Sequence, residues 1–177
     1  YLSLSFIIEE GLTMVEFWEI INSIKEACDK AGVRVVTGDT KVVERGKGDK
    51  IFINTSGIGE IHPQANISIA RIKSGDKIIV SNEIATHGMS IMSVRKGLEF
   101  ESEMVSDNRP LNHIIKKLLA TFGKSIQFLR DPTRGGVASV LNEIATDAKL
   151  GIDIFQKNIP VDDAVAGACE MLGLDPL

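Results

Sequence analysis

A strand pattern, a capped helix and a second strand pattern follow one another at the start of the chain, and this order restricts the fold more than any other feature. Residues 2–8 form an apolar run typical of a strand that is buried on at least one face. Thr13 and Glu16 then form a capping-box pattern, which predicts a helix start. The apolar stripe of this helix consists of Phe17, Ile20, Ile21, Ile24, Cys28 and Ala31, and Gly32 ends it. Residues 33–36 and 51–58 predict two further strands, so this stretch is part of an α/β layer.

The remaining residues show the same two patterns, after a change of composition at His62-Pro63-Gln64. Strands are expected at 77–81, 126–129 and 151–155, and helices at 87–96, 111–122, from 137 onward and at 161–172. A polar stretch at 101–109 separates two of these helices. We expect one domain at 1–62 and a second at 63–177, which gives a two-domain fold of the α/β (α+β) class.

Charge and composition exclude several classes of protein. The formal net charge is −4 and no basic cluster is longer than Lys116-Lys117, so no nucleic-acid surface is predicted. No apolar run approaches the roughly 18 residues of a membrane span. Cys28 and Cys169 form no CxxC pair and fall on apolar helix faces, which favours free thiols in a reducing, cytoplasmic setting.

The segment Gly38-Asp39-Thr40-Lys41 is the first candidate for chemistry, because it directly follows the strand expected at 33–36. Glycine allows a ligand to approach the backbone, and an aspartate oxygen suits Mg²⁺. Lys41 offers a compact cation or, with a lowered pKa, a base. An ordinary loop that carries a solvated lysine would have the same residues, so both interpretations remain open.

The second candidate is Asp131-Pro132-Thr133-Arg134-Gly135-Gly136, between an expected strand and an expected helix. The proline fixes a turn, the two glycines free the backbone, and amides at a helix N-terminus attract anions. Arg134 can bind two phosphate or carboxylate oxygens, while Asp131 can bind a metal or hold the arginine. A simple helix start is the alternative, but several anion-binding features at one helix end favour a functional site.

His87 lies at the start of an expected helix, where the helix dipole disfavours a charged imidazolium, so it could donate a hydrogen bond to a substrate. A structural histidine at a helix start is an equal alternative. The chain contains neither GxxxxGK[ST] nor GxGxxG. Any ATP would therefore bind without a P-loop or a Rossmann fingerprint.

Together these segments resemble the HypE family of hydrogenase maturation proteins, within the aminoimidazole ribonucleotide (AIR) synthetase superfamily. The matching residues are Tyr1-Leu2-Ser3 with 6–12, 36–43, 51–55 with 57–59, His87-Gly88, 105–107, 131–137 and 169–175. They extend along essentially the whole chain in a fixed order.

The resemblance implies a fold of two α/β domains, the first of which pairs across a homodimer to form a β-barrel. It implies ATP and Mg²⁺ as cofactors. The implied reaction is dehydration of a thiocarboxamide on a C-terminal cysteine to a thiocyanate, whose cyanide passes to the iron of a nickel–iron hydrogenase. The implied partners are the carbamoyltransferase HypF and the HypC–HypD complex. The family's first segment and terminal cysteine are not among these 177 residues, so both ends are expected to be cuts.

The resemblance also implies a role for each candidate residue. Asp39 would bind Mg²⁺, and Gly38 and Thr40 would lie near phosphate. Lys41 would withdraw the amide proton or stabilise charge as phosphate leaves, and His87 would sit at the cleft. The remaining residues would hold phosphates or orient the tail, and they are Asp131, Thr133, Arg134, Gly135 and Gly136.

Two alternatives remain open at this point. The first is another enzyme of the superfamily, namely selenophosphate synthetase, thiamine-monophosphate kinase or AIR synthetase itself. The second is a folded scaffold that binds maturation partners without catalysis. We expect the 177-residue chain alone to lack ATP turnover.

Overall fold

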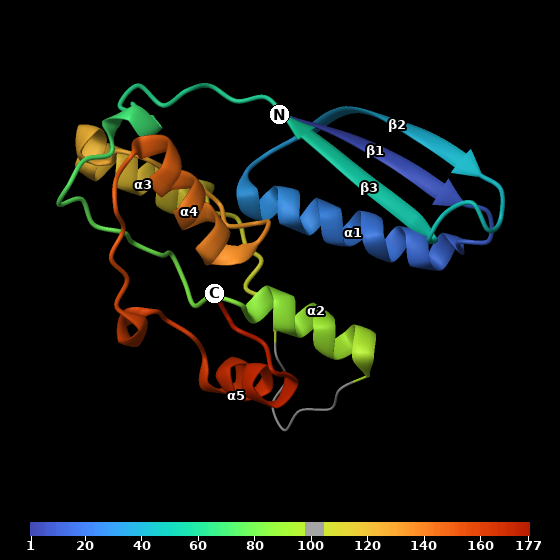
Figure 1. Ribbon diagram of the computed structural model, residues 1–177. Helices are drawn as coiled ribbons and strands as arrows, with labels where there is room; N and C mark the ends of the chain where they lie inside the picture. Colours follow the sequence, from blue (N-terminus) through green and yellow to red (C-terminus); the bar gives the residue numbers. More distant parts are fainter. Residues whose placement is uncertain (98–104) are drawn as a thin grey trace. The chain divides into compact units, whose positions relative to one another are not determined.

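The computed structural model describes residues 1–97 and 105–177, which divide into two compact units (Figure 1). Unit 1 contains Tyr1–Gln64 and Pro110–Thr121, and unit 2 contains Ala65–Arg109 and Phe122–Leu177. Of the polar stretch expected at 101–109, residues 101–104 lie outside the described part. Within the described ranges, no helix combines the length and apolar character needed to cross a membrane.

Unit 1 is built on a three-stranded sheet. Its strands are β1 (Leu2–Glu9), β2 (Val35–Val43) and β3 (Ile51–Gly57), in the order β2-β1-β3. The central strand β1 pairs parallel with β2 and antiparallel with β3. The parallel pair needs a crossover connection, which the helix α1 (Met14–Ala31) supplies.

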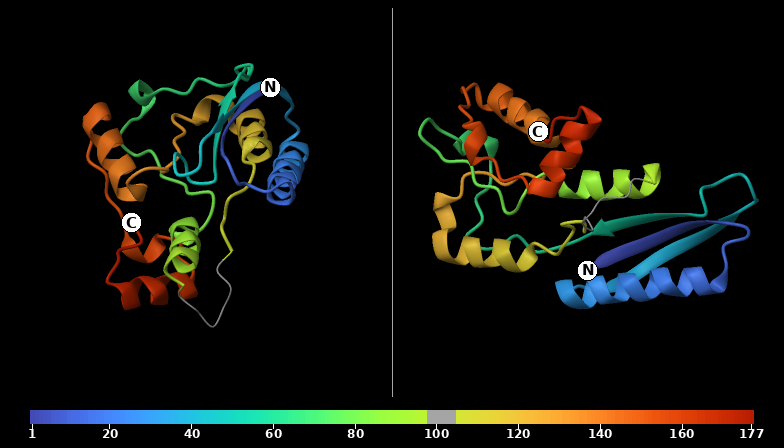
Figure 2. Two further views of the ribbon diagram at one scale, coloured as in Figure 1. Left: turned by 90° about the vertical axis from the view of Figure 1, so that its right-hand side faces the viewer. Right: turned by 90° about the horizontal axis from the view of Figure 1, so that it is seen from below.

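Helix α1 lies along one face of this sheet, as the views in Figures 1 and 2 agree. The rings of Phe6 in β1 and Phe17 in α1 meet edge to face with centroids 5.5 Å apart, and Phe6 is buried. The expected stripe of α1 is half-buried along its length, and Gly32 ends the helix as predicted. At that end, Asn112 and His113 of α3 (Asn112–Phe122) contact the last carbonyls of α1, at 2.6 and 3.0 Å.

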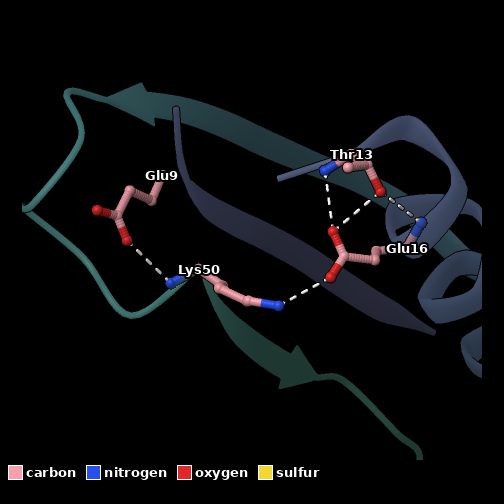
Figure 3. Close-up of polar contacts among 4 residues, drawn as sticks. All are labelled: Glu9, Thr13, Glu16 and Lys50. Carbon is pink, nitrogen blue, oxygen red and sulfur yellow. Dashed lines mark hydrogen bonds and ion pairs between the residues drawn. The ribbon is translucent and has the colours of Figure 1, made fainter. Parts of the chain in front are cut away.

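A polar network fastens the start of α1 to the turn between β2 and β3 (Figure 3). The predicted capping box is confirmed, because the Thr13 hydroxyl accepts from the Glu16 amide at 3.2 Å and the Glu16 carboxylate accepts from the Thr13 amide at 3.1 Å. The same carboxylate accepts from Lys50 Nζ at 2.8 Å. Glu9 accepts from the backbone amides of Lys50, at 3.1 Å, and of Gly46. The turn is therefore held by two carboxylates from neighbouring elements.

Unit 2 is formed by helices and extended segments. Its elements are α2 (Thr86–Lys96), α4 (Gly136–Ala148), α5 (Asp163–Leu172) and the 3₁₀ turns η1 (Ile69–Arg71), η2 (Gly123–Ser125) and η3 (Gln156–Asn158). Helices α2 and α5 pack side by side through a cluster of Met89, Val165, Ala168 and Cys169. Arg71 donates to the backbone carbonyls of Asn66, Lys124 and Ile126, and so joins η1 to η2.

Three expected strands, at 77–81, 126–129 and 151–155, are wrong, because none of them has a ladder partner in the described residues. Their sequences have strand character, but a strand needs a neighbouring edge for its backbone groups. Without such a neighbour, their apolar side chains remain in water: Ile79 is 88% exposed and Phe155 is 65% exposed.

Candidate functional site

The segment 38–41 lies inside a strand, not in a loop after one. β2 runs through Val43, because β-branched residues on both sides of the segment continue its pairing with β1. The expectation that a strand ends before Thr37 is therefore wrong. The physical reason is the continuous parallel ladder, in which Gly38 pairs with Leu4 and Lys41 with Ile7.

Alternation along β2 divides the candidate residues of unit 1 between two faces. Thr40 pairs with Phe6, which faces α1, so Thr40 and Gly38 belong to the helix-covered face. Asp39 and Lys41 lie on the opposite face, and Asp39 is exposed there. The Thr40 amide donates to Asp39 Oδ1 at 2.8 Å, which leaves the other carboxylate oxygen for a ligand. The structure thus brings Asp39 and Lys41 together and directs Thr40 away from them.

Gly38 is needed for close packing of the two strands. A Cβ atom at this position would lie 1.9 Å from the carbonyl oxygen of Leu4, far inside any permitted contact. The close approach that this glycine allows is therefore to β1, and no ligand is needed to explain it.

Two polar residues that sequence reasoning missed lie beside Asp39. Ser5 pairs with Asp39 on one side and with Asn54 on the other, so the three residues form a row across the exposed face. The signal was present, because β1 alternates Ser3 and Ser5 with apolar residues, but it has meaning only when the strand order is known.

In unit 2, the turn before α4 holds Asp131 in its charged form. The Thr133 hydroxyl donates to the Asp131 carboxylate, and this bond is the main cause that lowers the pKa of Asp131. Arg130 lies 3.9 Å from the same carboxylate and 3.3 Å from Glu143 of α4. An exposed carboxylate near Arg130 and Arg134 can bind a cation or orient a guanidinium.

Two left-handed glycines lead into α4. Gly135 and Gly136 have φ angles of +73° and +69°, which only glycine adopts at little cost. Gly135 accepts the helix hydrogen bond from the Ser139 amide at 3.4 Å, and Gly135 caps the start of the helix without a side-chain hydrogen bond. This local geometry suits an oxygen-rich anion. The anion-binding role of the segment 131–136 stays a prediction.

His87 is the second residue of α2 and its ring is held in place. Nδ1 lies 2.8 Å from the Ser106 hydroxyl, and Ser90 Oγ donates to the His87 carbonyl at 2.9 Å. The residue before the helix, Ala85, has a φ of +66°, an unusual conformation for a residue with a side chain. Such local strain often accompanies a functional site.

The carboxylates present fit a magnesium ion that is held jointly with phosphate oxygens. In residues 1–97 and 105–177, no three His, Cys, Asp or Glu side chains are grouped as a metal site. Mg²⁺ usually keeps several waters and takes only one or two carboxylates beside substrate phosphates. Asp39, which is exposed with one oxygen free of the Thr40 bond, suits that limited role.

Profiles of known families cover both parts of the chain. The profile of "AIR synthase related protein, C-terminal domain" matches residues 73–177, and that of "AIR synthase related protein, N-terminal domain" matches residues 1–61. The chain belongs to the AIR synthase related family. Its mixed α/β architecture agrees with the predicted fold class.

Within the AIR synthase related family, the chain is similar to HypE proteins. It is 46% identical over 177 residues to "Carbamoyl dehydratase HypE" of Bradyrhizobium diazoefficiens, covering 100% of this chain and 51% of that protein. The chain therefore spans about half the length of the curated relative. The resemblance to HypE stated from the motifs is confirmed.

Solved HypE structures have the same fold. "Hydrogenase Maturation Protein HypE in complex with ATP" gives a TM-score of 0.95 at 46% identity, over 100% of this chain and 52% of that chain. The "HypE-HypF complex" gives a TM-score of 0.95 at 49% identity, over 99% of this chain and 57% of that chain.

Proposed function

We propose that the whole protein is an ATP-dependent carbamoyl dehydratase of nickel–iron hydrogenase maturation. The observation that carries this proposal is 46% identity along the entire chain to a protein named carbamoyl dehydratase HypE. A HypE structure with ATP, superimposable at a TM-score of 0.95, supports nucleotide use. The substrate is the thiocarboxamide of a C-terminal cysteine, and the product is a thiocyanate for cyanide ligand synthesis.

The chemistry proceeds in two steps. ATP transfers its terminal phosphoryl group to the thiocarboxamide oxygen as one N–H proton leaves, which turns a poor leaving group into a good one. Loss of the second N–H proton and departure of phosphate then form the C≡N bond. Lys41 accepts a proton or stabilises the charge on the departing phosphate.

The proposed binding residues are described for each unit by itself. Asp39 holds Mg²⁺, which supplies charge neutralisation on the phosphates when bound. Gly38 and Thr40 lie near phosphate in this proposal as neighbours of Asp39 in β2, although both belong to the face of the sheet that α1 covers. In unit 2 the nucleotide phosphates or the cysteine tail are held by Asp131, Thr133, Arg134, Gly135 and Gly136. His87 donates a hydrogen bond to the substrate.

The proposed partners are a second copy of the protein, HypF and the HypC–HypD complex. A solved structure of a HypE–HypF complex supports HypF as the partner that supplies the carbamoyl group. The homodimer is supported by the exposed sheet face of unit 1, where Ile7 and Phe52 are paired neighbours at 45% and 51% exposure. The proposed setting is cytoplasmic, and the domain boundary at 62–63 remains a prediction.

The other enzymes of the superfamily remain the alternative within catalysis. Selenophosphate synthetase, thiamine-monophosphate kinase and AIR synthetase would use the same fold. The curated relatives that match the chain at 42–47% identity are HypE and hydrogenase expression/formation proteins, which favours the dehydratase. A scaffold role without catalysis is distinguished by the experiment below.

The decisive experiment is mass spectrometry of the C-terminal peptide of the whole protein after carbamoylation by HypF. Adding ATP and Mg²⁺ should remove one water from this peptide. The Asp39→Asn variant should keep the carbamoylated peptide unchanged, because it loses the magnesium ligand. A wild-type peptide that retains its water in the presence of ATP would contradict the dehydratase and favour the scaffold.

A further inference from the structure

The ring and the backbone of His87 are each held by a serine. Ser90 of α2, which is 6% exposed, donates its hydroxyl to the His87 carbonyl at 2.9 Å and fixes the first turn of the helix. Ser106 lies 19 residues further along the chain, and its hydroxyl oxygen is 2.8 Å from His87 Nδ1. His87 itself is exposed, so its Nε2 is the ring nitrogen left for a ligand.

The hydrogen bonds of Ser106 favour one arrangement of the protons on the ring. Its Oγ accepts from the Asn108 backbone amide at 3.2 Å, which uses one lone pair. The hydroxyl also has one proton, and donating it to His87 Nδ1 gives that proton an acceptor in the described part of the chain. If Nδ1 accepts, a neutral imidazole must carry its proton on Nε2.

We propose that Ser106 is a positioning residue that fixes His87 in the tautomer with hydrogen on Nε2. This arrangement makes the exposed side of the ring a hydrogen-bond donor, suited to a carbonyl or phosphoryl oxygen. The inference rests on the proposed function for its purpose, but the tautomer can be measured independently. No proton is transferred in this role.

The test is ¹⁵N NMR of the whole protein labelled at histidine, with His87 assigned by loss of its signals in His87→Gln. Wild-type His87 should show protonated Nε2 and unprotonated Nδ1. Ser106→Ala should shift the ring to a mixture of tautomers, and Ser106→Thr, which keeps the hydroxyl, should restore the wild-type pattern. Ser93→Ala is the control, because the Ser93 hydroxyl belongs to the same helix as His87 but binds the Ser90 carbonyl and not the ring. This variant should leave the tautomer of His87 unchanged.

Dehydration kinetics give a second readout. Ser106→Ala should lower kcat about tenfold, the equivalent of one net hydrogen bond, with little change in KM. A wild-type ring with hydrogen on Nδ1, or a Ser106→Ala ring identical to the wild type, would overturn the inference. Full activity of His87→Gln would contradict only the proposed role of His87, since the tautomer measurement stands apart from it.

Discussion

Different residues of β2 serve strand packing and the proposed chemistry. Gly38 faces the α1 side and touches the backbone of Leu4, while Lys41 lies on the exposed face. Substitutions two or three positions apart should therefore affect different properties of the protein. The sequence motif alone gave all four residues a role at the ligand, because it contains no information on which face each side chain takes.

Replacement of Lys41 by methionine should slow dehydration strongly without unfolding the protein. The side chain is exposed, so we expect the free energy of unfolding to change by less than about 0.5 kcal/mol. Loss of the proposed proton acceptor or charge-stabilising group should lower the dehydration rate by roughly a hundredfold or more. Lys47→Met, in the exposed turn before β3, is the matched control and should keep the wild-type rate. Equal rates for the two variants would remove Lys41 from the mechanism.

Replacement of Gly38 by alanine should instead destabilise unit 1. The added Cβ would lie 1.9 Å from the Leu4 oxygen, so the strands must separate, at a cost of about 1–3 kcal/mol. Urea unfolding followed by fluorescence of the single tryptophan, Trp18 in α1, reports on this unit. A Cβ atom added at Gly59 would have no neighbouring atom within 4 Å, so Gly59→Ala is the control. Unchanged stability of Gly38→Ala would show that β1 and β2 lie further apart.

At the level of elements, the polar network in Figure 3 makes the stability of unit 1 depend on pH. The hydrogen bond from Lys50 and those from Thr13 lower the pKa of Glu16 from 4.5 to about 2. A folded-state pKa below the unfolded value stabilises the fold above about pH 4.5, and this contribution disappears as the pH falls towards 2. The turn between β2 and β3 should loosen first.

Thermal unfolding of the wild type and Glu16→Gln, followed at Trp18, checks this expectation. The wild type should have the higher midpoint at pH 7, and the difference should shrink between pH 4.5 and 2 as Glu16 gains its proton. Glu26→Gln, on the same helix, is the control for loss of a negative charge. A difference between wild type and Glu16→Gln that stays constant down to pH 2 would show that the Lys50 contact is absent in solution.

Elements with their own local signals could be predicted from the sequence. The capping box of α1, the glycine that ends it and the helix expected at 111–122 are properties of neighbouring residues, and all three are found in the structure. The strands expected at 77–81 and 151–155 failed because a strand depends on a distant partner as well as on its own residues. For the same reason, the row of Asp39, Ser5 and Asn54 could not be seen before the strand order was known.

At the level of the whole molecule, the 177 residues correspond to about half of the HypE relatives. The family and its fold class followed from ordered motifs, which are specific even when the surrounding structure is unknown. The roles of the residues at 38–41 and 131–136 are proposals, because a binding role depends on the atoms of the nucleotide and substrate as well as on the residues of the chain.

The 177-residue chain alone should show no steady-state ATP turnover. Its exposed Asp39 supplies one carboxylate, and no larger metal-binding group occurs in the described residues, so the proposed metal would be held weakly. Phosphate release measured with excess ATP and Mg²⁺ should equal that of a protein-free control, while the carbamoylated whole protein should release one phosphate per thiocyanate. Sustained release by the short chain, abolished in its Asp39→Asn variant, would contradict this.

The lone extended segment at 77–81 has a practical consequence for handling the polypeptide. Lys-Ile-Ile-Val-Ser is short, contains three consecutive β-branched residues and no proline, and its Ile79 is 88% exposed. Backbone groups without a ladder partner can template cross-β stacking between molecules. Concentrated solutions of the chain will therefore tend toward fibrils that bind thioflavin, and a charge at position 79 offers the simplest gatekeeper against them.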